Sequence, residues 1–126
     1  GKIEIATSAF TLAEVYYKES KIIESAIETL SKFLTRDYCK TVPVDMEVAS
    51  QAQRLQMYVK QKMKGKIIKP PDAIHIASAQ RAKVDVLHSY DKRVLSFNEK
   101  LLPPNNEKMK ICKPGQELEL FAPLIK

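Results

Sequence analysis

At 126 residues, with 44% hydrophobic and 29% charged side chains, the chain has the length and composition of one globular domain, which we expect to span residues 1–126. No apolar run is long enough to cross a membrane and no signal peptide is visible, so we expect no membrane segment. The net charge of +6 fits a polyanionic partner, but a solvated lysine-rich surface is the commoner cause of such an excess. The two cysteines, Cys39 and Cys112, lack the spacing of a metal site and predict free thiols in a reducing, cytoplasmic setting.

The first segments predict a strand followed by a helix. Residues 2–7 alternate between apolar and polar side chains, which predicts a short strand. Ser8 fits a helix start, and apolar side chains then recur at helical spacing up to Tyr16. Glu14 lies near the edge of this apolar stripe. Its ordinary role would be in a capping box with Thr11, and that role lapses if the helix begins at Ser8.

The middle of the chain predicts two further helices around a strand. Residues 21–35 carry apolar side chains at steps of three and four, which is typical of an amphipathic helix. Residues 39–44 have strand character, and Pro43 predicts that this strand is short or lies at an edge, because proline cannot donate to a ladder. Asp45 has the position of the N-cap of a long helix rather than of a metal ligand, and Gly65 ends that helix or lies in the following loop. The predicted buried face of the long helix carries Val48, Ala52, Leu55 and Val59.

Two consecutive prolines mark the start of the next helix. Pro70 and Pro71 cannot lie inside a helix but can open one, which predicts a helix over residues 71–82. Its many small side chains indicate close packing against another element. Asp72 falls in the first turn, where the helix dipole favours a carboxylate, so an ordinary helix-start acid is an open alternative to a role in a site.

The last third of the chain predicts a buried strand followed by turns. Residues 84–87 form the strand, and its carboxyl end is where open α/β sheets place their sites. Asp91 there is either a site acid or a turn residue. Ser89 either bonds a phosphate or a metal-bound water, or bonds its own backbone. Residues 103–106 predict a loop, and residues 111–121 predict a further strand or a packed extension.

The alternation of predicted strands and helices indicates an α/β fold, namely a three-layer α/β/α sandwich with a mainly parallel central sheet. In such a fold the helix starts that follow the strands gather at one edge of the sheet. Glu14, Asp72 and Asp91 can therefore converge although they are far apart in the chain. Three carboxylates repel one another unless a cation neutralises them, and their hard oxygens select Mg²⁺ or Mn²⁺. Such an ion would activate a water and clamp a phosphate, which are the steps of phosphodiester hydrolysis.

Three segments carry a resemblance to a known family. They are Ser8-x-x-x-Leu12-x-Glu14-Val15, Lys69–Ala79 and Val84–Asp91. In this order they resemble the PIN domain, a family of metal-dependent nucleases that includes the VapC toxins, over residues 3–98. The resemblance implies that Glu14, Asp72 and Asp91 are the catalytic and metal-binding residues and that Mg²⁺ or Mn²⁺ is the cofactor. It also implies that the substrate is RNA, cleaved to a 5′-phosphate and a 3′-hydroxyl.

Four further residues are candidates for contacts with the RNA: Ser8, Ser89, Lys92 and Arg93. Lys92 and Arg93 directly follow Asp91. Surface charge in a turn is the ordinary alternative for these two cations, and we favour it slightly because exposed lysine and arginine are common.

The chain departs from the family pattern at its start. PIN domains usually begin with a strand that ends in an aspartate, whereas the first aspartate here is Asp37, which follows Glu14. The sequence is therefore expected to be N-terminally incomplete relative to the family. Four explanations stay open: a trimmed fragment, a strand supplied by a separate chain, replacement by another strand such as the tail, or a PIN-like module that no longer cleaves RNA.

Two functions follow from these observations. The first is a metal-dependent endoribonuclease, in the narrower role of the toxin of a toxin–antitoxin pair. That role implies an antitoxin protein as partner and, by family analogy, a homo-oligomer in the form of a dimer. The second is a catalytically incomplete PIN-like module that binds RNA or protein. Metal-dependent cleavage that is lost in Asp72→Asn would identify the first function, and metal-independent binding would identify the second.

Overall fold

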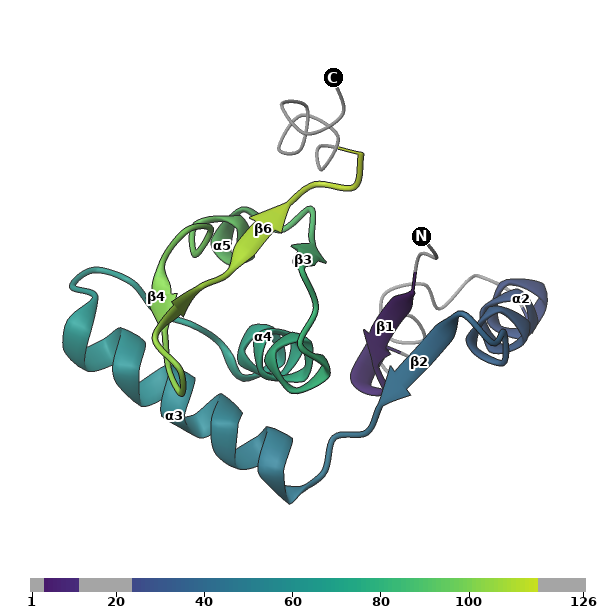
Figure 1. Ribbon diagram of the computed structural model, residues 1–126, viewed down its shortest axis with the longest axis horizontal. Coiled ribbons are helices and arrows are strands. Elements are labelled where there is room, and N and C mark those ends of the chain that lie inside the picture. The colour runs from purple at the N-terminus through teal and green to yellow at the C-terminus, as the bar shows by residue number, and fades with distance from the viewer. Residues whose placement is uncertain (1–3, 12–23, 116–126) are drawn as a thin grey trace.

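Helices and strands alternate along the chain in the computed structural model, which describes residues 4–11 and 24–115. In chain order they are β1 (Ile5–Ser8), α2 (Glu24–Leu34), β2 (Cys39–Val42), α3 (Met46–Lys62), α4 (Pro70–Ala82), β3 (Val86–His88), α5 (Lys92–Leu95), β4 (Leu101–Leu102), β5 (Glu107–Lys108) and β6 (Lys110–Cys112). Figure 1 shows their arrangement, with the long helix α3 along one side of the molecule. The predicted α/β fold class is confirmed.

The described strands form three two-stranded sheets. β1 and β2 are parallel, in a register that runs from Ile5 opposite Cys39 to Ser8 opposite Val42. β3 and β6 are also parallel, whereas β4 and β5 form an antiparallel hairpin. Most of the pairing is therefore parallel, as predicted. Within the described residues the two parallel pairs are separate sheets, and Figure 1 shows them on different sides of α4.

The core lies mainly between α3 and α4. The predicted apolar face of α3 is confirmed, because each of its four residues is buried: Val48, Ala52, Leu55 and Val59. α4 packs against this face with small and branched side chains that are also buried, namely Ala73, Ile76 and Ala77. Small side chains at facing positions allow two helices to approach closely, which explains the composition of α4. Phe97, Leu102 and Ile111 complete the core from the C-terminal third of the chain.

The ends of the long helices follow the local signals in the sequence. Asp45 is the N-cap of α3, and its Oδ1 accepts a hydrogen bond from Val48 N at 2.9 Å, as predicted. Pro70 and Pro71 occupy the first positions of α4, which also agrees with the prediction. Gly65 has a φ of +79° in the loop between these helices, a conformation that glycine adopts without strain.

Three predicted strands differ from the observed ones by one to three residues. β2 ends at Val42 rather than at residue 44. β1 extends to Ser8, so Ser8 ends a strand, and the helical residues begin only at Phe10. β3 begins at Val86 rather than at residue 84, and it is half-buried rather than buried. β3 starts later than predicted because the end of α4 uses the preceding residues. Lys83, the C-cap of α4, lies in the left-handed region (φ 53°), and Val84 N donates to Ala79 O at 3.2 Å.

The sequence did not indicate the short elements of the C-terminal third. Lys92 and Arg93, predicted to lie in a turn, belong to the one-turn helix α5. The predicted loop at residues 103–106 is the tip of the β4–β5 hairpin. β6 (Lys110–Cys112) overlaps the strand or packed extension predicted for residues 111–121 only at residues 111–112, and residues 116–126 lie outside the described part.

A partly buried polar cluster fixes this hairpin to the two long helices. Gln51 Nε2 donates to Gln80 Oε1 at 2.9 Å and to Pro103 O at 2.6 Å. Gln80 Nε2 also donates to Pro103 O, at 2.8 Å. Buried amides are stable only when they are hydrogen-bonded, so the cluster holds α3, α4 and the hairpin in one arrangement.

Two features bear on the predictions from composition. Both cysteines are free thiols, and Cys112 is buried while Cys39 is half-buried. Among the described helices, none combines the length and the apolar character that a membrane crossing requires.

Candidate active site at the start of α4

Asp72 lies in the first turn of α4, where the sequence predicted it. The two prolines before it fix the start of the helix, and the dipole of α4 favours a carboxylate at this position. Asp72 is half-buried. The helix-start role and a role in a site are both compatible with this placement.

The end of β1 lies beside the same part of α4. The rings of Phe10 and His75 meet edge to face, with centroids 5.9 Å apart. His75 follows Asp72 by three residues, so the two side chains lie on one face of α4. The end of β1 and the first turns of α4 are therefore neighbours, while the convergence of the three acids stays a prediction.

Ser8 closes β1 with its side chain turned to the backbone. It is buried, and its Oγ accepts a hydrogen bond from Phe10 N at 3.2 Å. Thr7 Oγ1 and Thr11 Oγ1 are 3.2 Å apart across the same turn. These contacts give Ser8 a structural role at the strand end, and its contact with RNA stays a prediction.

Glu14 lies outside the described residues, so the structure does not place its carboxylate. The alternative role of Glu14 in a capping box needs Thr11 at the N-cap position. Phe10 and Thr11 are both helical, so this helix begins upstream of Thr11. The capping-box alternative for Glu14 is therefore disfavoured.

Asp91 follows β3 and is the N-cap of α5. Its Oδ1 accepts a hydrogen bond from Arg93 N at 2.8 Å, and its own N–H donates to Ser89 Oγ at 3.1 Å. These bonds hold Asp91 at the carboxyl end of β3. Lys92 and Arg93 are exposed beside it. Asp91 and Ser89 thus both make the local backbone hydrogen bonds that were the structural alternative to a role in a site. The capping bond uses only Oδ1 of Asp91, so Oδ2 takes no part in it.

Within residues 4–11 and 24–115, no group of three His, Cys, Asp or Glu side chains is arranged to hold a metal ion. The predicted group of Glu14, Asp72 and Asp91 includes a residue outside these ranges, so it is not tested by this observation. The donor set suits the predicted ions, because carboxylate oxygens are the ligands that Mg²⁺ and Mn²⁺ prefer.

Two surface hollows of the described part of the chain lie away from Asp72 and Asp91. One is lined by residues of β2, the β2–α3 connection and the end of α4, and the other by residues of α3, α4 and the hairpin tip. Arg81, at the C-terminal end of α4, lines both, whereas Asp72 and Asp91 line neither.

Comparison with known proteins agrees with this geometry. The family model of the PIN domain matches residues 1–100. No curated protein and no solved structure matches the chain. The match covers the β1–α4 contact, Asp72 and Asp91 in one continuous stretch, so the chain belongs to the PIN domain family.

Proposed function

We propose that the chain is a metal-dependent endoribonuclease that hydrolyses phosphodiester bonds in RNA, with Glu14, Asp72 and Asp91 as its site acids. PIN domains are typically metal-dependent nucleases, and PIN nucleases act on RNA. The observation that carries the proposal is the position of Asp72, in the first turn of α4 and on the face that contacts the end of β1.

The chain would contribute carboxylates on a fixed backbone and exposed cations. The Pro-Pro start of α4 holds the backbone of Asp72, and the α5 cap holds that of Asp91. A bound Mg²⁺ or Mn²⁺ would supply a reactive water and neutralise charge on the phosphate. Lys92 and Arg93, exposed next to Asp91, would contact the flanking phosphates, and Ser89 would orient Asp91 through their hydrogen bond.

The narrower role of a toxin is part of the same proposal. In that role the chain would act in the cytoplasm as a homodimer, and a small antitoxin protein would cover Asp72 and Asp91 and exclude RNA. The support for this role is the order of the three motifs, which resembles that of VapC toxins.

The test is cleavage of a fluorescent RNA by the full chain with Mn²⁺, Mg²⁺ or EDTA, with Asp72→Asn alongside. Asp85→Asn is a matched control, because Asp85 is an exposed aspartate that follows α4 and has no proposed role. We expect cleavage that requires the metal, is lost in Asp72→Asn and is unchanged in Asp85→Asn.

A catalytically incomplete module that binds RNA or protein is the second candidate. The observation that favours it is the cap bond of Asp91, which gives that acid a complete structural reason to be present. Folded protein that binds RNA in EDTA but never cleaves it would establish this second function and refute the nuclease.

A further inference from the structure

The positive charge of the chain is concentrated in one stretch. Residues 54–83 contain eight lysine or arginine residues and a single acid, Asp72, while the rest of the chain contains thirteen basic and fourteen acidic residues. The whole excess of +6 therefore comes from this stretch. At its centre is a lysine run, which occupies the end of α3 and the loop to α4: Lys60, Lys62, Lys64, Lys66 and Lys69.

The loop that carries the lysine run is fixed to the fold. Lys66 Nζ donates to Ser96 O at 2.9 Å and lies 5.2 Å from the centre of the Phe97 ring. Ile68 is buried, and its carbonyl accepts a hydrogen bond from Gln56 Nε2 at 3.5 Å. The other four members of the run are exposed: Lys60, Lys62, Lys64 and Lys69. Because the backbone is already held, a ligand that binds these lysines has little loop entropy to overcome.

Helix stability explains only part of the lysine run. Lys60 and Lys62 lie in the last turn of α3, where the helix dipole favours a cation. Lys69 is the N-cap of α4, where the same effect disfavours a cation, and its side chain makes no capping hydrogen bond. Lys64 lies in the loop and serves neither helix. An anionic partner would account for Lys64 and Lys69 and would relieve the repulsion within the whole run.

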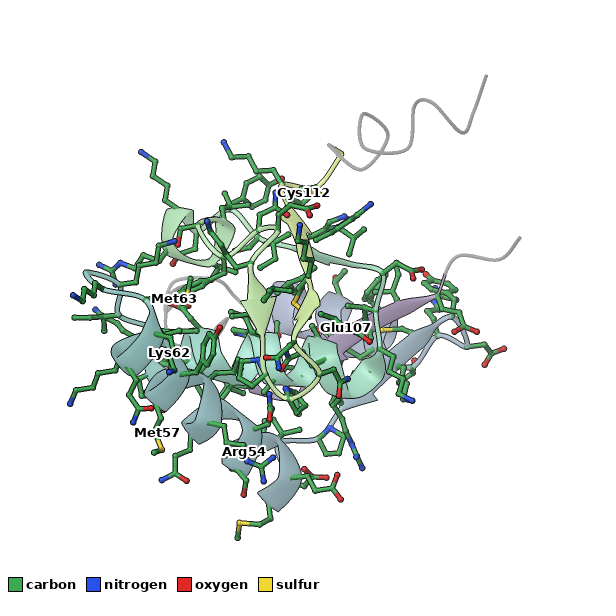
Figure 2. All side chains as sticks on the ribbon, turned by 60° about the vertical axis from the view of Figure 1, so that its left-hand side comes forward. Arg54, Met57, Lys62, Met63, Glu107 and Cys112 are labelled. Carbon is green, nitrogen blue, oxygen red and sulfur yellow. The ribbon has the colours of Figure 1, made fainter. Side chains whose placement is uncertain are left out.

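We infer that the lysine run binds the phosphate backbone of RNA and leads the strand to the start of α4; this inference rests on the proposed RNA substrate. Figure 2 shows Lys62 and Met63 together at the end of α3 that opens into the loop. From there the loop ends at Lys69, which directly precedes the helix that carries Asp72 in its first turn. RNA is favoured over an acidic protein because the run ends next to the site that the RNA has to reach. Ammonium groups contact phosphates without reading bases, so the surface would not select a sequence.

The test measures RNA affinity without cleavage. Every protein carries Asp72→Asn, the buffer contains EDTA, and a labelled single-stranded RNA is titrated at several salt concentrations by fluorescence anisotropy. In the run variant, the four exposed lysines of the lysine run are replaced by glutamine: Lys60, Lys62, Lys64 and Lys69. The control variant loses the same charge at four exposed lysines elsewhere: Lys32, Lys40, Lys108 and Lys113. Circular dichroism verifies that both variants are folded.

Each phosphate contact with single-stranded RNA contributes about 0.7 to the slope of log affinity against log salt. We therefore expect the magnitude of this slope to be about 3 smaller in the run variant than in the parent, which carries Asp72→Asn alone. Between about 50 and 200 mM salt, the parent would then lose about 50-fold more affinity than the run variant. The control variant is expected to keep at least most of the parental slope.

Equal losses in the two variants would overturn the inference, because net charge alone would then explain binding. An unchanged slope in the run variant, or no binding by the parent, would also overturn it. Competition by polyglutamate as effective as that by RNA would assign the run to an acidic protein instead. A smaller slope in the run variant together with a failed cleavage test would refute the nuclease and leave this binding surface standing.

Discussion

The substitutions Asp91→Asn and Asp91→Ala separate two roles of one side chain. Asp91 caps α5 through a single hydrogen bond from Arg93 N to its Oδ1. Asparagine retains an oxygen for this bond and is as good an N-cap residue as aspartate, whereas alanine has none. Both substitutions remove the negative charge that the proposed site uses. Only Asp91→Ala is therefore expected to destabilise the fold, while both are expected to impair cleavage.

The size of each effect follows from the surroundings of α5. Loss of an N-cap costs about 1 kcal/mol. α5 is a single turn with an exposed cap, but its Val94 is only 4% exposed and belongs to the core, so fraying of this turn also disturbs packing. We expect Asp91→Ala to lower the Tm by about 3 °C, and Asp91→Asn to stay within about 0.5 kcal/mol of the parent. Loss of a site charge worth about 3 kcal/mol in the transition state would slow cleavage about 100-fold in both variants.

The assays are thermal unfolding followed by circular dichroism, and cleavage of RNA with Mn²⁺ at a temperature well below the Tm. Asp85→Asn again serves as the matched control for loss of a surface charge. Cleavage by Asp91→Asn at the parental rate would show that Asp91 is a helix cap and not a site acid. An unchanged Tm in Asp91→Ala would refute the capping argument.

Two further predictions concern stability alone. Ser78 Oγ is buried in α4 and has no hydrogen-bond partner among the described residues. Ser78→Ala is therefore expected to raise the free energy of unfolding, measured by urea denaturation, by about 1 kcal/mol. A lower free energy of unfolding in the variant would show that the hydroxyl has a partner. Asp45→Ala removes the N-cap of α3 and is expected to lower the free energy of unfolding by about 1 kcal/mol, while Asp45→Asn keeps the capping oxygen and the stability. Loss of RNA cleavage in folded Asp45→Asn would contradict a purely structural role for Asp45.

Local backbone chemistry made part of the fold predictable. Pro43 lies directly after the end of β2, which has four residues, in agreement with the prediction of a short or edge strand. Asp45 and the pair Pro70 and Pro71 set the starts of the two long helices. Each of these signals acts within about one helical turn of the residue that carries it, so no knowledge of distant contacts is needed.

Contacts between residues far apart in the chain determine the parts of the fold that could not be predicted from the sequence. Gln51, Gln80 and Pro103 form one cluster although they are 23 to 52 residues apart, and no periodicity in the sequence indicates that they meet. The start of β3 was misplaced because Val84, which was predicted to begin the strand, instead donates to Ala79 O at the C-terminal end of α4. α5 and the β4–β5 hairpin have four and two residues per element, which is too short for a periodic pattern.

Asp72 and Lys69 together support a nuclease site at the start of α4 better than either residue does alone. A helix start is sufficient to explain an acid in the first turn of α4, and on that ground Asp72 could be purely structural. The same reasoning does not explain Lys69 at the N-cap, where a cation opposes the helix dipole, nor the absence of any other acid between Arg54 and Lys83. A nuclease site needs this combination, because the carboxylate faces a metal ion and the surrounding cations face the phosphates. If the cations were present only for solubility, acids would be expected to be interspersed with them, as they are in the rest of the chain.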